Sequence, residues 1–423
     1  MSSNPPRGLL RALGPGLLLA GAAVGVSHLV QSTRAGAVYG FALLWLVLLA
    51  NVAKYPAFRF GPQYAAATGT SLLEGYRRQG KWALGVYGLL TVGTMFTVQG
   101  AVALVTAGLA KKALGLPGTP VVIAGGTMAV CAALLALGRY RWLDRINKVM
   151  VVALTLSTVT ATALALPKLD FSALAFWPQG IEAKDLFFCA ALVGWMPSAI
   201  DVAAWHSMWT LARSEDVGER PTVKAVLADF HLGYWGAAGL AVCFVILGAG
   251  VMHGSGVELA NSAGGFAGQI IELYASTLGE WSRPMIGGCA FAVMFTTTFT
   301  VVDGFPRALA VLTERMRGPE QAWAPTKGDR RFNTAYWVSL AVLGAGSLAV
   351  ITLFIGSLKA MVDLATILSC LTAPLLAWLN HRAILGDEVP PEHRPSKGLQ
   401  IVSWAGITML AAVAVGYLVL RLS

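Results

Sequence analysis

Charged residues are scarce in this chain. Asp, Glu, Lys and Arg together make up 12% of its 423 residues, whereas a soluble protein of this length carries about a quarter. No polar interval is long enough to bury a core of its own, which excludes a separate soluble domain. Hydrophobic residues make up 56% of the chain, and apolar runs long enough to cross a membrane recur from end to end. The composition therefore predicts an all-α polytopic membrane protein.

Cysteine is also rare, and no catalytic motif is present. The 5 cysteines lie in apolar stretches without metal-ligand spacing, so we interpret them as small buried hydrophobic residues. The sequence contains no zinc-protease motif, nucleophile elbow or phosphate-binding loop. We therefore expect no cofactor and no enzymatic activity. The net charge of +10 does not indicate a nucleic-acid partner, because excess basic charge in a membrane protein usually lies in cytoplasmic loops.

Eleven hydrophobic segments predict about eleven transmembrane helices. They lie at about 12–38, 40–64, 82–112, 119–138, 147–166, 186–212, 225–250, 284–312, 333–356, 359–384 and 399–420. Basic residues follow every even-numbered helix, which predicts a cytoplasmic N-terminus in a cell (inner) membrane. The loop at 251–283 instead carries Glu258, Glu272 and Glu280. Within it, residues 266–281 have apolar residues at near-helical spacing and predict a short interfacial helix on the outer side.

Two of these helices are interrupted. Residues 25–28 in the first helix read Gly-Val-Ser-His, and residues 194–198 in the sixth read Gly-Trp-Met-Pro-Ser. Proline removes a backbone donor, and irregular backbone at membrane depth is tolerated only inside the protein or beside a water-filled cavity. The breaks lie five helices apart at matching depths. This pattern predicts a five-plus-five inverted repeat with broken helices 1 and 6 and a solute site between the breaks.

We expect one transmembrane domain, with repeat one at about 12–166, repeat two at about 186–384 and an extra helix at about 399–420. The candidate substrate-binding residues all lie at the two breaks. They are Gly25, Val26, Ser27, His28, Val193, Gly194, Met196 and Ser198.

Several blocks of the chain have the residues and spacing of a known family. They are Gly14-Pro15-Gly16, AGAVYGFALLWLVLLA at 35–50, ATGTSLLE at 67–74, and the Met-Pro of helix 6 followed by Trp-His-Ser at 205–207. In these blocks the chain resembles the Nramp family of divalent-metal transporters. The resemblance implies the LeuT-type fold and a divalent-metal cargo, often coupled to protons.

The functional positions depart from that family's pattern. The family's metal-binding Asp corresponds to Gly25 here, and the Asn of the same motif corresponds to His28. The family's thioether position is kept as Met196, whereas its helix 3 carboxylates correspond to Thr94 and Thr97. Hard divalent ions need anionic oxygen ligands, while softer ions accept imidazole and thioether. Met196 and His28 are therefore the metal ligands only if the chain carries a metal.

Three charged residues within the predicted spans are candidate charge or coupling residues, namely Arg34, Lys54 and Asp201. A charge inside a membrane costs at least ~2.5 kcal/mol. The two basic residues make the centre less favourable to cations, and we expect Asp201 to compensate one of them. Lys54 either contacts the cargo or extends its long apolar stem so that the amine lies toward the end of its helix. His28 is either a ligand or proton carrier, or a histidine bonded to a carbonyl in the break.

The sequence thus predicts an Nramp-related secondary transporter that works by alternating access. Its selectivity is shifted away from transition metals, toward a small anion such as bicarbonate or a neutral polar solute. Divalent-metal uptake is the first alternative, and a membrane sensor that binds without transporting is the second. The expected partners are a small solute or ion and the lipid bilayer, with no nucleic acid.

Overall fold

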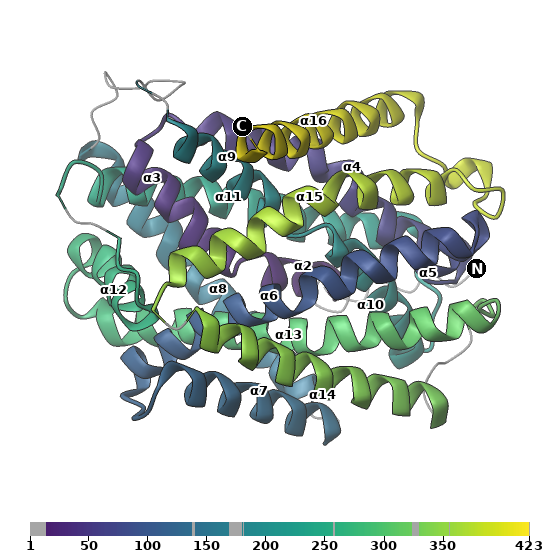
Figure 1. The fold of residues 1–423 in the computed structure, drawn as a ribbon, viewed down its shortest axis with the longest axis horizontal. Helices are drawn as coiled ribbons and strands as arrows, with labels where there is room; N and C mark the ends of the chain where they lie inside the picture. The colour runs from purple at the N-terminus through teal and green to yellow at the C-terminus, as the bar shows by residue number, and fades with distance from the viewer. Residues whose placement is uncertain are drawn as a thin grey trace, which may run out of the picture.

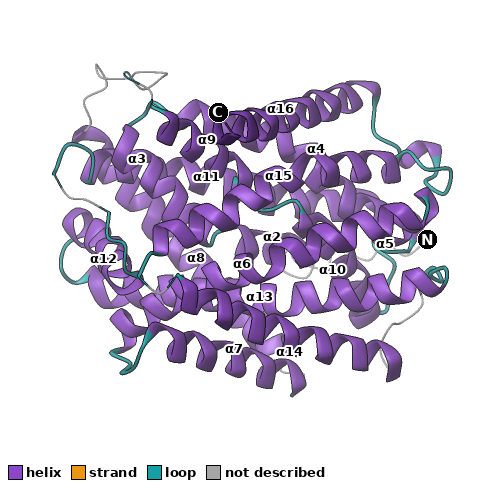
Figure 2. Ribbon diagram, viewed as in Figure 1, coloured by secondary structure: helices purple, strands orange, loops and turns teal. Residues whose placement is uncertain are grey.

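The structure is a computed structural model that describes residues 14–137, 140–168, 180, 182–256, 259–323, 330–354 and 356–422. All regular elements in this part of the chain are helices (Figure 2), so the predicted all-α fold is confirmed. Within the described residues, the helices long and apolar enough to cross a membrane are α6 (Lys81–Leu114), α11 (Val223–Val251), α13 (Ser282–Arg317), α14 (Arg330–Leu353), α15 (Leu358–Ile384) and α16 (Lys397–Leu422). The other main segments of the bundle are α2 (Pro15–Ala23), η1 (Ser27–Ser32), α3 (Thr33–Tyr39), α4 (Leu44–Thr68), α7 (Pro120–Ala136), α8 (Tyr140–Ala165), α9 (Ala183–Trp195) and α10 (Asp201–Val217).

Shorter helices connect these segments. They are α5 (Leu72–Gln79), α12 (Ala263–Leu278), η2 (Leu166–Lys168) and η4 (Pro391–His393). The helix predicted in the loop after the seventh span is confirmed as α12, whereas α5 was not expected. Figure 1 shows α12 and α5 at opposite ends of the bundle. Residues 12–13 of the first predicted helix, together with Arg139 and Glu258, lie outside the described residues.

The fifth span begins earlier than expected, at Tyr140 instead of about residue 147. Its first turns contain Arg141 and Arg145, which lie between the fourth and fifth predicted helices. Polar residues at a helix end can lie at the membrane interface, so their charge does not end the helix.

Helices at the centre of the bundle are more buried than those at its edges. In their most apolar windows, 72% of α13 and 67% of α6 is buried, against 22% for both α14 and α16. Figure 1 shows α16 along one edge and α14 along the other, with α2 and α6 between them. Apolar side chains can face lipid without cost, so the outer helices need less protein contact than the inner ones.

Glycine permits close approach where the interrupted first helix crosses α11. A Cβ added to Gly36 of α3 would lie 2.0 Å from the Val245 carbonyl oxygen of α11. Conversely, a Cβ on Gly248 of α11 would lie 2.3 Å from the Thr33 carbonyl oxygen. Small residues that let backbones meet are typical of helix contacts in membranes. This contact holds the half-helix that follows the first break.

The half-helix before the first break is anchored at its start. The carboxylate of Asp229 in α11 accepts hydrogen bonds from the backbone N–H groups of Gly14 at 3.2 Å and Gly16 at 2.6 Å. A carboxylate at a helix N-terminus pairs with otherwise unsatisfied donors and with the helix dipole. Both halves of the first transmembrane segment are therefore held against α11.

Candidate functional site

The first break is closed by neutral hydrogen bonds. In a continuous helix the Gly21 carbonyl would accept from the N–H of Gly25, but that N–H donates to Ala23 O at 2.8 Å instead. The freed Gly21 carbonyl accepts from the Thr297 hydroxyl of α13 at 2.8 Å. The Ser27 hydroxyl donates to Ala23 O at 2.5 Å. Hydroxyl groups therefore complete the backbone at this break.

His28 is directed toward α11. Its Nε2 lies 2.8 Å from the Ala237 carbonyl oxygen and its Nδ1 lies 2.8 Å from the Ser27 hydroxyl. A carbonyl only accepts, so Nε2–H is the donor to Ala237. The side chain is fully buried. The Ser27 hydroxyl has one hydrogen, which it donates to Ala23 O, so the bond to the Ala237 carbonyl is the one that fixes the ring. His28 therefore joins the first break to α11.

The second break contains a buried ammonium group. Lys54 of α4 is fully buried, and its Nζ donates to the Gly194 carbonyl oxygen at 2.7 Å and to the Ser198 carbonyl oxygen at 3.2 Å. Gly194 lies in the last turn of α9, and Ser198 lies in the non-helical segment before α10. The amine of Lys54 is therefore directed to the backbone of the second break.

Asp201 begins α10 immediately after this break. Its side chain is buried, and its Oδ1 has no hydrogen-bond partner among the described residues. Of the two basic residues that Asp201 was expected to compensate, Arg34 pairs with Asp363 of α15, at 2.6 Å from its guanidinium. The other predicted partner of Asp201, Lys54, is close enough to interact with it electrostatically.

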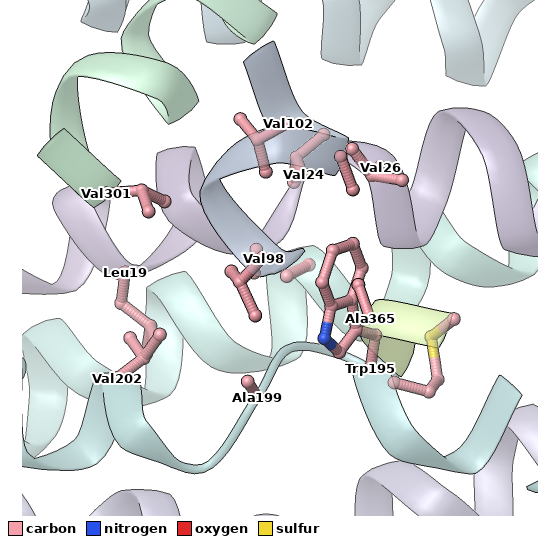
Figure 3. Close-up of a cluster of buried hydrophobic side chains, with 14 of the residues drawn as sticks. Leu19, Val24, Val26, Val98, Val102, Trp195, Ala199, Val202, Val301 and Ala365 are labelled. Carbon is pink, nitrogen blue, oxygen red and sulfur yellow. The ribbon is translucent and has the colours of Figure 1, made fainter. Parts of the chain in front are cut away.

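A small cavity of ≈ 30 Å³ lies between the two breaks. The first break contributes Val26 and Ser27 to its wall, and the second contributes Ser198, Ala199 and Asp201. The remaining wall comes from Ala22, Val98, Val102, Trp195, Val202, Trp205, Thr297, Val301 and Phe305. Figure 3 shows Val26, Val98 and Trp195 around this space, beside the extended segment that carries Ala199. The cavity is thus mostly apolar, with a few polar groups contributed by the breaks and α13.

The other predicted binding residues lie around the cavity without lining it. Val193 is buried in α9, and Gly194 packs so closely on α15 that an added Cβ would lie 2.0 Å from the Thr366 carbonyl oxygen. Gly25 lies behind Thr297, whose methyl carbon would be 2.9 Å from an added Cβ. The Met196 sulfur lies 3.9 Å from the Ser32 hydroxyl oxygen. These four residues shape the breaks by packing.

Three further polar residues of the membrane helices have structural partners. Asp303 accepts from Arg307 at 2.8 Å and from the Tyr336 hydroxyl at 2.9 Å. Thr94 and Thr97 bond to carbonyls of their own helix, at 3.0 Å and 2.8 Å respectively. None of these groups lines the cavity.

The cavity residues that come from α6 and α13 were not among the predicted site residues. Thr297 belongs to a run of three threonines in α13, and buried hydroxyls within a membrane helix are a usable signal because they need partners. The apolar wall residues Val98, Val102 and Val301 give no such signal, since valine is abundant in every span. Only the packing of the helices brings them to the cavity.

The arrangement of two broken helices around a central cavity in a helical bundle is that of a LeuT-type secondary transporter. A family model for natural resistance-associated macrophage protein-like (Nramp) proteins matches residues 16–420. The chain belongs to the Nramp family, as the sequence blocks indicated. It is therefore a multi-pass membrane transporter of a solute and not an enzyme.

The chain is also similar to individual proteins and to a solved structure. The chain is 35% identical to the uncharacterized protein PM0681 of Pasteurella multocida, over 95% of this chain and 90% of that protein. It is 23% identical to a divalent metal cation transporter MntH of Chromohalobacter salexigens, over 92% and 88% of the two chains. A crystal structure of the Eremococcus coleocola manganese transporter superimposes with a TM-score of 0.67 at 13% identity, covering 98% of this chain and 88% of that one.

Proposed function

We propose that this chain carries a small uncharged polar solute, and not a transition metal, through the cavity between the two breaks. The observation that carries the proposal is that Asp201 lines the cavity while its Oδ1 has no hydrogen-bond partner among the described residues. Buried polar atoms almost always have a hydrogen-bond partner. A donor group on the cargo completes this one, while the apolar walls contact the rest of the solute.

The ligand groups around the cavity argue against a transition metal. Gly25 has no side chain, His28 is bonded to the Ala237 carbonyl, and neither Met196 nor His28 lines the cavity. The part of the chain that the structure describes contains no cluster of three His, Cys, Asp or Glu residues able to hold a metal ion. Asp201 is a single carboxylate, and divalent cations need several ligands at once.

The charges beside the cavity argue for an uncharged cargo. The ammonium of Lys54 opposes a cation at the second break, and the carboxylate of Asp201 opposes an anion at the start of α10. Of the two non-metal classes, the neutral solute is therefore favoured over a small anion such as bicarbonate. The cavity has room for about one or two water molecules, which favours a small solute.

Divalent-metal transport remains the second candidate, because relatives of this chain are named divalent metal cation transporters.

We also infer a cytoplasmic N-terminus in the inner membrane. The basic residues Arg77 and Arg78 of α5 lie at the opposite end of the bundle from α12 (Figure 1). Basic loops are enriched on the cytoplasmic side.

Uptake into proteoliposomes tests the proposal. The panel contains labelled urea, glycerol and acetamide, with bicarbonate and manganese as the competing classes. We expect saturable uptake of an uncharged solute that falls at least roughly tenfold in Asp201→Asn, because the hydrogen bond to the carboxylate becomes a weaker one to a neutral amide oxygen. Asp387→Asn is the matched control, since Asp387 is fully exposed.

Saturable manganese or bicarbonate uptake without uptake of the uncharged solutes would overturn the proposal in favour of that ion. Ligand binding to the purified protein without any flux would support the sensor alternative instead.

A further inference from the structure

The second break leaves two carbonyl oxygens without helical donors. In a continuous helix the Gly194 carbonyl would accept from the N–H of residue 198, and the Ser198 carbonyl would accept from the N–H of residue 202. The first bond is lost where α9 ends at Trp195. The second is lost because the Val202 N–H donates to Ala199 O at 3.3 Å. Both freed oxygens are occupied by Lys54 Nζ.

The surroundings of this ammonium group are those of a cation site. Two backbone carbonyls approach it, and the Gly194 carbonyl belongs to the C-terminal end of α9, where the helix dipole is negative. Asp201 on α10 and the Cys370 thiol on α15 are the titratable groups close enough to affect it. In transporters with broken helices, unwound carbonyls and half-helix C-terminal ends hold the coupling cation.

We propose that the Lys54 ammonium is a covalently attached substitute for a bound cation at the second break. The amine is covalently attached to the protein throughout the transport cycle and donates to both carbonyls, so this break needs no cation from solution. Removing the side chain beyond Cβ leaves a vacant site for a small primary ammonium ion. The inference concerns the backbone of the break and holds whatever the cargo is.

Chemical rescue tests this inference. Lys54→Ala removes three methylene groups and the ammonium, and n-propylammonium has the same atoms. The thermal unfolding of the purified protein in detergent is followed by intrinsic fluorescence, with n-propylammonium chloride, 1-propanol or sodium chloride added. We expect Lys54→Ala to lower the melting temperature by roughly 5 °C or more. Propylammonium should recover at least half of that loss in a saturable manner.

The controls separate a charge site from general effects. 1-Propanol has a similar size and can donate one hydrogen bond, but it has no charge. Lys111→Ala is the matched variant, because Lys111 Nζ also donates to a backbone carbonyl, that of Gly118 at 3.1 Å, from an exposed position. Neither Lys111→Ala nor the wild-type protein should gain stability from propylammonium.

Equal stabilisation of Lys54→Ala by 1-propanol, or no stabilisation by propylammonium, would overturn the inference. If Lys54→Ala does not fold, Lys54→Met and Lys54→Arg decide the matter by their yield of monodisperse protein. Recovery with Arg but not Met supports a required positive charge, and recovery with Met alone overturns it. These measurements involve no transport, so they stand apart from the uptake test of the proposed function.

Discussion

The two helix breaks adjoin the same cavity, but the protein satisfies their carbonyl groups differently. At the first break the donors are the hydroxyls of Ser27 and Thr297, at 2.5 Å and 2.8 Å from the carbonyls they bond. At the second break the donor is the ammonium of Lys54, with Asp201 nearby. A hydroxyl can bond a carbonyl without adding charge to the cavity, whereas an ammonium occupies the position of a cation. One break is therefore neutral and the other carries a built-in charge.

The way the backbone oxygens of the breaks are satisfied differs from what a metal site between the breaks requires. A metal site between two breaks needs ligand oxygens free to coordinate the ion. Here a hydroxyl occupies the Gly21 carbonyl, and an ammonium occupies those of Gly194 and Ser198. The chain thus keeps the transporter fold of its family while donors of its own occupy these backbone oxygens.

The largest effect is expected at the charged break. Lys54→Met keeps most of the apolar stem but leaves two carbonyls and the Asp201 carboxylate without their cationic partner. We expect a loss of about 3–5 kcal/mol in unfolding free energy, as for other broken buried charge pairs. The loss is measured by denaturant unfolding in detergent.

The double variant Lys54→Met/Asp201→Asn sharpens this test, because it removes both charges. It should be more stable than the sum of the single variants predicts. Additive losses would show that Asp201 does not compensate Lys54.

The second effect concerns the space over Gly25. In Gly25→Ala the new Cβ would lie 2.9 Å from the Thr297 methyl carbon, so we expect a loss of about 1–3 kcal/mol from overpacking. Adding Thr297→Ser, which removes the methyl carbon and keeps the hydroxyl donor to Gly21, should recover part of it. The matched control is Gly93→Ala, since an added Cβ at Gly93 meets no atom within 4 Å.

The contact between position 25 and Thr297 also limits manganese binding, because it leaves no room for a carboxylate at position 25. We expect calorimetry to detect no micromolar manganese binding in the wild-type protein or in Gly25→Asp. Gly25→Asp/Thr297→Ala, in which a carboxylate has room, should bind manganese more tightly than either. Micromolar affinity in the wild-type protein would contradict the reading of the first break as neutral and without metal ligands.

A smaller effect is expected for the hydroxyl that reaches the first break. Thr297→Val keeps the shape but removes the donor to the Gly21 carbonyl, which should cost about 1–2 kcal/mol. Thr300→Val is the control, because the Thr300 hydroxyl bonds Thr296 of its own helix at 2.7 Å. A similar fall in melting temperature for both variants would mean that the bond to Gly21 contributes nothing of its own.

The smallest effect on stability is expected away from both breaks. The ion pair between Arg34 and Asp363 is partly exposed, with side-chain exposures of 19% and 30%. Such pairs contribute about 0–1 kcal/mol. Asp363→Asn should therefore change the melting temperature by less than any of the substitutions at the breaks, and a larger change would place this pair among the main supports of the fold.

The sequence by itself determined the spans and the two breaks. Long apolar runs must cross the membrane as helices, because lipid offers no partner for backbone groups. Gly25 and Pro197 interrupt two of these runs, and the effect of proline on a helix is local. The family blocks, such as Gly14-Pro15-Gly16, could also be identified from the sequence, because each is a short run of neighbouring residues. The intramembrane charges Lys54 and Asp201 were also visible, since any such charge must have a function or a partner.

Only the tertiary structure decided which partners these groups have. Lys54 bonds Gly194 across 140 positions of the chain, and Arg34 bonds Asp363 across 329. His28 is directed toward Ala237, and Thr297 fills the space over Gly25. Each of these contacts depends on how one helix is rotated and shifted against another. That packing is set by side chains along the whole interface, so the residues at the break alone do not determine it.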